Sequence, residues 1–160
     1  MLIKGENSYV SLDEANEWFS GYLYNEAWLA SDDEKKERAL ITSTKILDSY
    51  SYKGEPVDPN QKLQMPRNYE YVNAYGLTCK LNPIPQRYIE CLYKLVIHLL
   101  NNDDILIDTG WVETLKVASI ELQKIHRAEG IPSSILEYLS EFCWDVYGFG
   151  NKGPIWWRRN

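Results

Sequence analysis

The chain has 160 residues and a net charge of −6, with 44% apolar and 25% charged residues. This length suits one domain with a real core, and the composition is that of a folded globular protein rather than a disordered one. The acidic balance argues against a general nucleic-acid-binding protein, which would carry a basic surface, and no apolar run is long enough to predict a membrane partner.

The first part of the chain predicts two amphipathic helices. A capping-box pattern starts at Ser11, and apolar residues follow it at three- and four-residue steps, so we expect a helix over about 12–24. A second capping box starts at Ser31 and predicts a helix over about 32–50. Its acidic first turn suits the positive end of the helix dipole.

Prolines interrupt the helical pattern over residues 52–85, where they exclude a long helix. A connection of this length is usually functional or fastened to something, and its tyrosines favour fastening. We therefore take five residues of this insertion as candidates for contacts between subunits: Met65, Arg67, Tyr69, Tyr71 and Tyr75.

The second part of the chain predicts two further helices. Pro85 starts a helix over 86–101 that is apolar most of the way round, as expected of a central buried helix. Residues 112–126 partly alternate, which indicates a short hairpin or a bent strand pair, although a short helix fits nearly as well. A last helix is expected over about 133–146, with Ser133 or Ser134 as its N-cap.

These elements predict a mainly α fold. We expect a four- to five-helix bundle-like domain over 1–146, with the long irregular Pro/Tyr-rich insertion and a small β-hairpin, followed by an extended C-terminal tail over 147–160. So short a tail cannot bury two adjacent indoles against itself, so it should dock on its own domain, on another subunit or on a different partner. Its interface candidates are Lys152, Ile155, Trp156, Trp157, Arg158 and Arg159.

Known catalytic and metal-binding patterns are missing from the sequence. It has no HExxH, GxxxxGK[ST], GxSxG or GxGxxG motif, and its two histidines, His98 and His126, stand in different predicted elements. The three cysteines are widely spaced and form no CxxC pair, which favours reduced cytoplasmic thiols over a zinc site or a disulfide. We therefore expect no enzyme, no metal and no cofactor.

Charge is distributed unevenly along the chain. Residues 6–37 hold nine acids against two lysines, whereas residues 147–160 hold three cations and no acid. A molecule with an acidic front and a basic aromatic end can stack head to tail with its own copies or bind an acidic neighbour. The alternative is an acidic helix surface in solvent and a basic end without a partner.

An ordered series of motifs resembles the phage head–tail connector proteins, the adaptor family that joins the portal ring to the tail. The series begins with "YVSLDEANEWF" from Tyr9 and continues with an aromatic-x-Gly at 52–54 and a Pro-x-Gln-x-Leu-x-x-Pro-Arg pattern at 59–67. Ile84-Pro85 then starts a helix that ends in paired leucines. The resemblance spans roughly residues 8–145, although Met65 and Tyr52 stand where the family usually has Trp.

The resemblance implies a structural virion protein at the head–tail junction, made in the host cytoplasm. It implies a homo-oligomeric ring, commonly of twelve copies, with the portal protein above and a tail or nozzle protein below. Double-stranded DNA would pass through the channel during packaging and ejection without specific binding. Some members of this group carry the label of DnaT-like single-stranded-DNA-binding proteins, so the alternative is a replication protein that stacks bases on aromatics beside cations.

Overall fold

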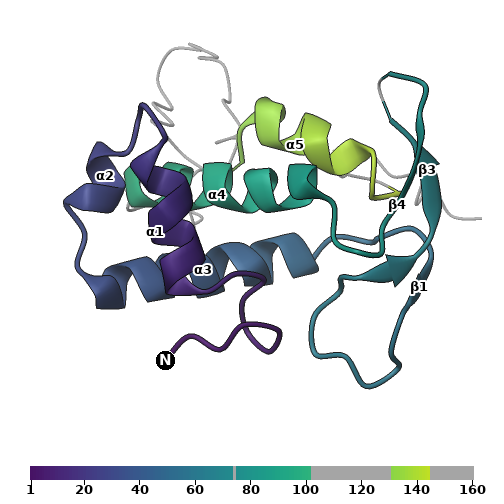
Figure 1. Cartoon of the computed structure of the whole chain (residues 1–160), viewed down its shortest axis with the longest axis horizontal. Helices are drawn as coiled ribbons and strands as arrows, with labels where there is room; N and C mark the ends of the chain where they lie inside the picture. The colour runs from purple at the N-terminus through teal and green to yellow at the C-terminus, as the bar shows by residue number, and fades with distance from the viewer. Residues whose placement is uncertain (74, 102–130, 145–160) are drawn as a thin grey trace, which may run out of the picture.

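The computed structural model describes residues 1–73, 75–101 and 131–144, which form a mainly helical structure with small antiparallel β pairs (Figure 1). This confirms the predicted mainly α class for the described residues. Their helices are α1 (Leu12–Ser20), α2 (Glu26–Leu29), α3 (Asp33–Asp48), α4 (Gln86–Asn101) and α5 (Ser133–Ser140). None of these helices is both long and apolar enough to cross a bilayer.

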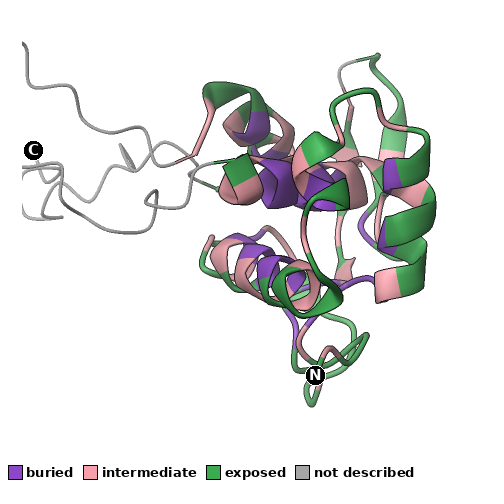
Figure 2. Ribbon diagram, turned by 90° about the vertical axis from the view of Figure 1, so that its left-hand side faces the viewer, coloured by how far each residue is buried: buried purple, intermediate pink, exposed green. Residues whose placement is uncertain are grey.

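Helix α4 is the centre of the core, as its apolar sequence predicts. It packs against α2, α3 and α5, and Figure 2 shows that the buried residues lie on the faces that the helices turn toward one another. The buried side chains of α4 belong to Tyr88, Cys91, Leu92, Tyr93, Leu95, Val96 and Ile97. Each large apolar side chain buried in this way contributes roughly 1.5–3 kcal/mol of transfer free energy.

The first helix is shorter than the prediction of 12–24. It ends at Ser20 because Gly21 caps it, donating its N–H to the Trp18 carbonyl at 3.2 Å. The chain then turns back into α2, which the sequence analysis missed. This turn buries Trp28, whose ring stacks on Phe19 with 4.3 Å between centroids, so tertiary packing decides where α1 stops.

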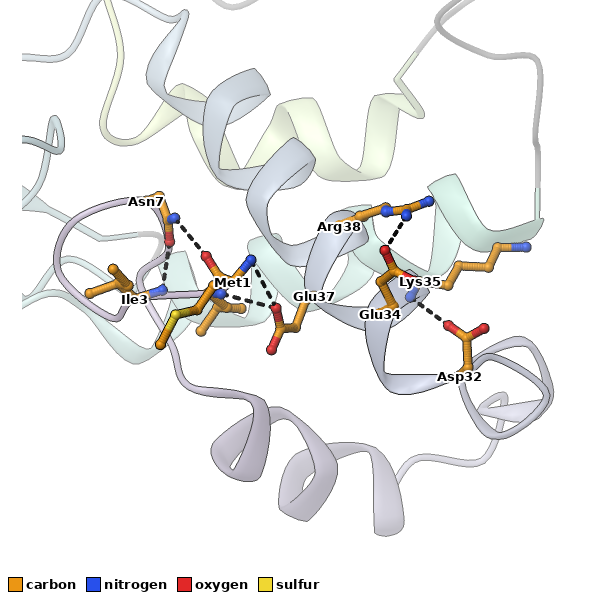
Figure 3. Close-up of polar contacts among 9 residues, drawn as sticks. Met1, Ile3, Asn7, Asp32, Glu34, Lys35, Glu37 and Arg38 are labelled. Atoms are coloured by element: carbon orange, nitrogen blue, oxygen red, sulfur yellow. Dashed lines mark hydrogen bonds and ion pairs between the residues drawn. The ribbon is translucent and has the colours of Figure 1, made fainter.

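The helix caps confirm one predicted capping box and correct the other. At α1, the Ser11 hydroxyl accepts from the Glu14 N–H at 3.2 Å while the Glu14 carboxylate accepts from the Ser11 N–H at 2.8 Å. At α3, the N-cap is Asp32, whose carboxylate accepts from the Lys35 N–H at 2.7 Å (Figure 3). Ser31 lies one residue before this cap, and its hydroxyl donates back to the Ala27 carbonyl within α2.

The last described helix also differs from its prediction. It ends at Ser140 rather than near 146, and its N-cap is Pro132, with no side-chain capping bond from Ser133 or Ser134. The helix stops because the chain beyond it pairs with the start of the insertion. The Lys53 N–H donates to the Phe142 carbonyl, and the Trp144 N–H donates to the Ser51 carbonyl, both at 2.9 Å.

The segment before α1 is attached to α3. The Leu2 N–H donates to the Glu37 carboxylate at 3.0 Å (Figure 3). The Asn7 side chain stabilises the turn of residues 3–7 by accepting from the Ile3 N–H at 2.8 Å. Tyr9 and Val10 are then buried in the core. The N-terminal segment is therefore part of the folded unit, and it positions α1 against α4.

The strands of the described residues lie in the insertion, which was predicted to be irregular. Strand β1 (Glu55–Pro56) pairs antiparallel with β2 (Arg67–Asn68), and β3 (Glu70–Val72) pairs antiparallel with β4 (Thr78–Lys80). Strands of two or three residues are too short to show an alternating pattern. The hairpin expected at 112–126 lies outside the described residues.

Arg67 fixes the base of the insertion within its own subunit. Its guanidinium donates to the Lys53 carbonyl at 3.0 Å, to the Gly54 carbonyl at 2.5 Å and to the Gln64 side chain at 2.9 Å. Gly54 has φ +76°, and a Cβ there would lie 2.6 Å from the Asn68 carbonyl oxygen. Packing therefore explains the glycine of the aromatic-x-Gly motif, because the backbones at Gly54 and Asn68 approach so closely that only glycine fits at position 54.

We predict that Gly54→Ala destabilises the fold by about 3 kcal/mol, because backbone strain and steric overlap add together. Gly76→Ala is the matched control. It has nearly the same φ, +78°, but nothing within 4 Å of the added Cβ, so it should lose only about 1 kcal/mol. Urea unfolding followed by circular dichroism measures both, and equal losses would contradict the close approach at Gly54.

Candidate functional site

A groove of about 730 Å³ lies where α1, the first turns of α4 and the chain leading into α4 meet. Figure 1 shows α1 crossing in front of α4. The apolar and aromatic part of the lining consists of Tyr9, Val10, Trp18, Pro66, Pro83, Ile84, Ile89 and Tyr93. The polar part includes Lys4, Glu14, Glu17, Asn82 and Gln86. Its volume lies within the range of ordinary ligand and peptide pockets.

Stacked aromatic rings form one wall of the groove. The half-buried indole of Trp18 stacks on Tyr93 with centroids 4.6 Å apart and on Tyr22 with centroids 4.7 Å apart. Phe19 meets Tyr93 edge to face from the core side at 5.4 Å. These contacts join α1 to α4, so the aromatic wall has a fixed position and needs no rearrangement to receive a flat group.

Two carboxylates on α1 make the groove acidic. Glu14 is paired with Lys4, and this hydrogen bond is the main reason that the pKa of Glu14 lies below its ordinary value. Glu17 is exposed beside it. Burial, together with the charges of Glu14 and Glu17, raises the pKa of Tyr93 to about 12, so this tyrosine stays neutral near pH 7. The lining therefore favours a cation over a phosphate.

A buried tyrosine network supports the groove from beneath. The Tyr9 hydroxyl donates to the Asp48 carboxylate and accepts from the Met65 N–H at 3.2 Å. The Tyr9 ring meets Tyr88 edge to face at 5.1 Å, and the hydroxyls of Tyr88 and Tyr52 lie 3.0 Å apart. Burial raises the pKa of each of these tyrosines, so they remain neutral and serve as structural ties.

The β3–β4 hairpin forms a second candidate surface, and it projects from the helices in Figure 1. Three large side chains near its tip are exposed: Val72 at 64%, Tyr75 at 85% and Leu77 at 62%. The Asn73 side chain fixes the tip by accepting from the N–H groups of Tyr75 and Leu77, each at 3.0 Å. The hairpin is thus an ordered arm with an apolar end.

A hollow of about 580 Å³ beside the hairpin brings together Arg67, Tyr69 and Lys80, the residue types that nucleic-acid binding needs. Both cations already have partners within the fold. Arg67 donates to backbone carbonyls, and the Lys80 ammonium lies 3.5 Å from the Glu70 carboxylate. This hollow therefore offers little free positive charge to a phosphate backbone.

The structure separates the predicted contact residues of the insertion. Met65 is buried, and Tyr69 and Tyr71 pack partly against the core, with Tyr71 edge to face on Phe142 at 5.2 Å. Of the five candidates, Tyr75 is the one that projects into solvent. The tail candidates Lys152, Ile155, Trp156, Trp157, Arg158 and Arg159 lie outside the described residues, as does the boundary near 147.

Sequence reasoning missed the groove, because its lining comes from segments more than 60 positions apart. Trp18 and Glu17 read as parts of one amphipathic helix, and Tyr93 as part of another. The signal that could have indicated the groove is the aromatic series Trp18, Phe19 and Tyr22 at the end of α1 and just beyond it, because Phe19 alone fills the buried position there.

Metal and thiol chemistry find no support in the described ranges. There, no group of three or more His, Cys, Asp or Glu side chains could hold a metal ion. Cys91 and Cys143 are buried free thiols, and burial raises the pKa of each to about 12. Both thiols are therefore protonated and poorly reactive near neutral pH.

Comparison with known proteins gives a family for this chain. Residues 2–135 match the family described as "Putative DnaT-like ssDNA binding protein", and the chain belongs to that family. The match covers the N-terminal segment, the insertion, α4 and the start of α5, and so includes both candidate surfaces. Searches of curated proteins and of solved structures found no match.

We predict that Tyr9→Phe lowers the free energy of unfolding by about 1.5–3 kcal/mol at pH 7, because it removes the hydrogen bond to the ionised Asp48 carboxylate. Burial raises the pKa of Asp48, and the Tyr9 hydrogen bond opposes this rise. The bond favours the ionised form, so the cost should shrink as the pH falls through the folded-state pKa of Asp48.

Tyr52→Phe is the control, because its hydroxyl donates to the Leu47 carbonyl at 2.8 Å and hydrogen-bonds the Tyr88 hydroxyl at 3.0 Å, neither of which is a carboxylate. Its cost should be about 1 kcal/mol and should not change with pH. Urea unfolding at pH 7 and pH 4 measures both variants. A Tyr9→Phe cost that is the same at both values would contradict the charged hydrogen bond.

Proposed function

We propose that the protein is a structural head-to-tail adaptor of a phage particle. It assembles as a ring between the portal protein and the tail, and double-stranded DNA passes through the central channel. The observation that carries the proposal is the ordered β3–β4 arm with its exposed apolar tip, together with the motif series shared with head–tail connectors.

The arm suits protein contact because its exposed side chains are of the types that interfaces bury. Tyr75 is a large amphipathic ring, and Val72 and Leu77 flank it at the tip. Tyrosine is enriched in the buried centres of interfaces, and exposed apolar clusters mark contact sites. The Asn73 side chain accepts from the N–H groups of Tyr75 and Leu77, and these bonds reduce the entropy that a partner would have to remove on binding.

The charge of the molecule suits a conduit that does not hold its cargo. The net charge is −6, and the acids concentrate in the first helices, where residues 6–37 hold nine of them. A surface of this sign repels phosphates over about one Debye length, roughly 10 Å at moderate salt. An acidic channel lining would let DNA slide, whereas a binding groove would need the opposite sign.

The family description favours a second function, binding of single-stranded DNA. Such binding needs aromatic rings beside available cations. In the described part of the chain, the Trp18–Tyr93 stack offers the rings but stands beside Glu14 and Glu17, and the adjacent Lys4 is paired with Glu14. The electrostatics of the groove therefore support the adaptor more than the replication protein.

The two functions predict different behaviour of the purified full-length protein. As an adaptor, it should form rings in negative-stain images, alone or with its portal, and it should show no saturable binding of a fluorescent poly-dT oligonucleotide at low salt. Salt-sensitive oligonucleotide binding, without rings, would overturn the adaptor proposal and support the alternative. Fluorescence anisotropy and electron microscopy of the same preparation measure both.

We predict that the double variant Tyr75→Ser/Leu77→Ser keeps its thermal midpoint but loses ring formation, because both side chains are exposed in the subunit. The control is Leu23→Ser/Tyr24→Ser, which removes two equally exposed apolar side chains from the turn between α1 and α2. Light scattering after size exclusion gives the assembled fraction. Equal assembly of the two variants would exclude the hairpin as the contact arm.

A further inference from the structure

We infer that the groove between α1 and α4 binds residues 154–159 of a neighbouring copy. The inference rests on the proposed ring assembly and assigns it a specific contact. The segment reads PIWWRRN from Pro154 to the last residue, so it offers two indoles followed by two guanidinium groups. The groove offers a stacked aromatic wall followed by carboxylates.

The apolar part of the groove matches the indoles. Trp18 presents a half-buried ring that is stacked on both Tyr93 and Tyr22, and the lining also includes Pro83, Ile84 and Ile89. A flat ring can therefore stack on the Trp18 wall or lie on the proline and isoleucine side. Buried tryptophans are among the strongest single contributors to protein contacts, so a Trp pair is a suitable anchor.

The polar part of the groove matches the guanidinium groups. Glu17 is exposed on α1 and lines the groove one turn from Glu14, whose carboxylate is paired with Lys4. Arginine binds carboxylates through paired hydrogen bonds and also stacks on aromatic faces. Residues 147–160 carry three cations and no acid, so the segment and the groove have opposite charge.

A second copy is the occupant that builds an assembly. The groove and the Trp-Arg segment are different parts of one chain, so their contact between copies is heterologous, the kind of contact that forms a ring when its rotation closes. Each copy would then insert its own segment into the groove of one neighbour and bind the segment of the other neighbour in its own groove. Weak individual contacts become strong when the ring closes, because the last contact forms within one assembly.

The direct test is titration of a labelled peptide of residues 151–160 into a full-length protein whose Trp156, Trp157, Arg158 and Arg159 are changed to Ala. The peptide should bind, and Glu17→Lys in the same protein should weaken binding about tenfold or more by reversing the charge. Glu137→Lys, an exposed charge reversal on α5, is the matched control and should leave binding unchanged. Lack of binding, or equal losses in the two variants, would overturn the inference.

Mixing two full-length variants tests whether the segment comes from another copy. One carries Glu17→Lys and keeps its segment, and the other carries the four Ala changes and keeps its groove. A contact between copies predicts that the mixture forms a heterodimer, seen by light scattering, that neither variant forms alone. A mixture that stays monomeric would show that no contact forms between copies, and would overturn the inference.

The outcomes separate this inference from the proposed function. Wild-type rings without peptide binding would reject the groove contact and leave the adaptor in place. Peptide binding and a heterodimer, in a protein that makes no rings and binds poly-dT, would keep the groove contact and reject the adaptor.

Discussion

The burial of Tyr88 at the start of α4 is the contact on which the rest of the structure depends. Its fully buried ring meets Tyr9 at 5.1 Å, Tyr52 at 5.8 Å and Phe142 at 5.9 Å, all near edge to face. These partners come from the N-terminal segment, the start of the insertion and the chain after α5. One side chain thus gathers three distant segments, and it places α1 and the insertion relative to α4.

This arrangement explains how a small helical core can present two separate surfaces. The insertion is fastened at its base by Arg67 and by the contacts of Lys53 with the chain after α5, so the β3–β4 arm extends from a fixed point. The N-terminal segment holds α1 across α4, so the aromatic and acidic walls of the groove meet. Among the described residues, the arm presents exposed apolar side chains, and the groove presents aromatic and acidic side chains.

Local rules predicted much of the helical framework and little of the candidate site. The Ser11 box and the apolar surface of 86–101 are set by neighbouring residues, so α1 begins and α4 lies where the sequence indicates. The short helix α2 depends on the packing of Trp28 on Phe19, which no local pattern contains. Arg67 was a candidate for contacts between subunits, yet its guanidinium completes backbone hydrogen bonds of its own chain. The groove needs two helices to cross, and that information is tertiary.

Hydrogen–deuterium exchange on the full-length protein tests the central claim, recognition of protein rather than of nucleic acid, most directly. Exchange is compared in a dilute sample, in a concentrated sample and in a dilute sample with excess poly-dT. The account predicts that concentration protects the groove segments 9–18 and 82–93 and the hairpin around 72–78, while poly-dT changes nothing. Protection of these segments by poly-dT, with no effect of concentration, would contradict it.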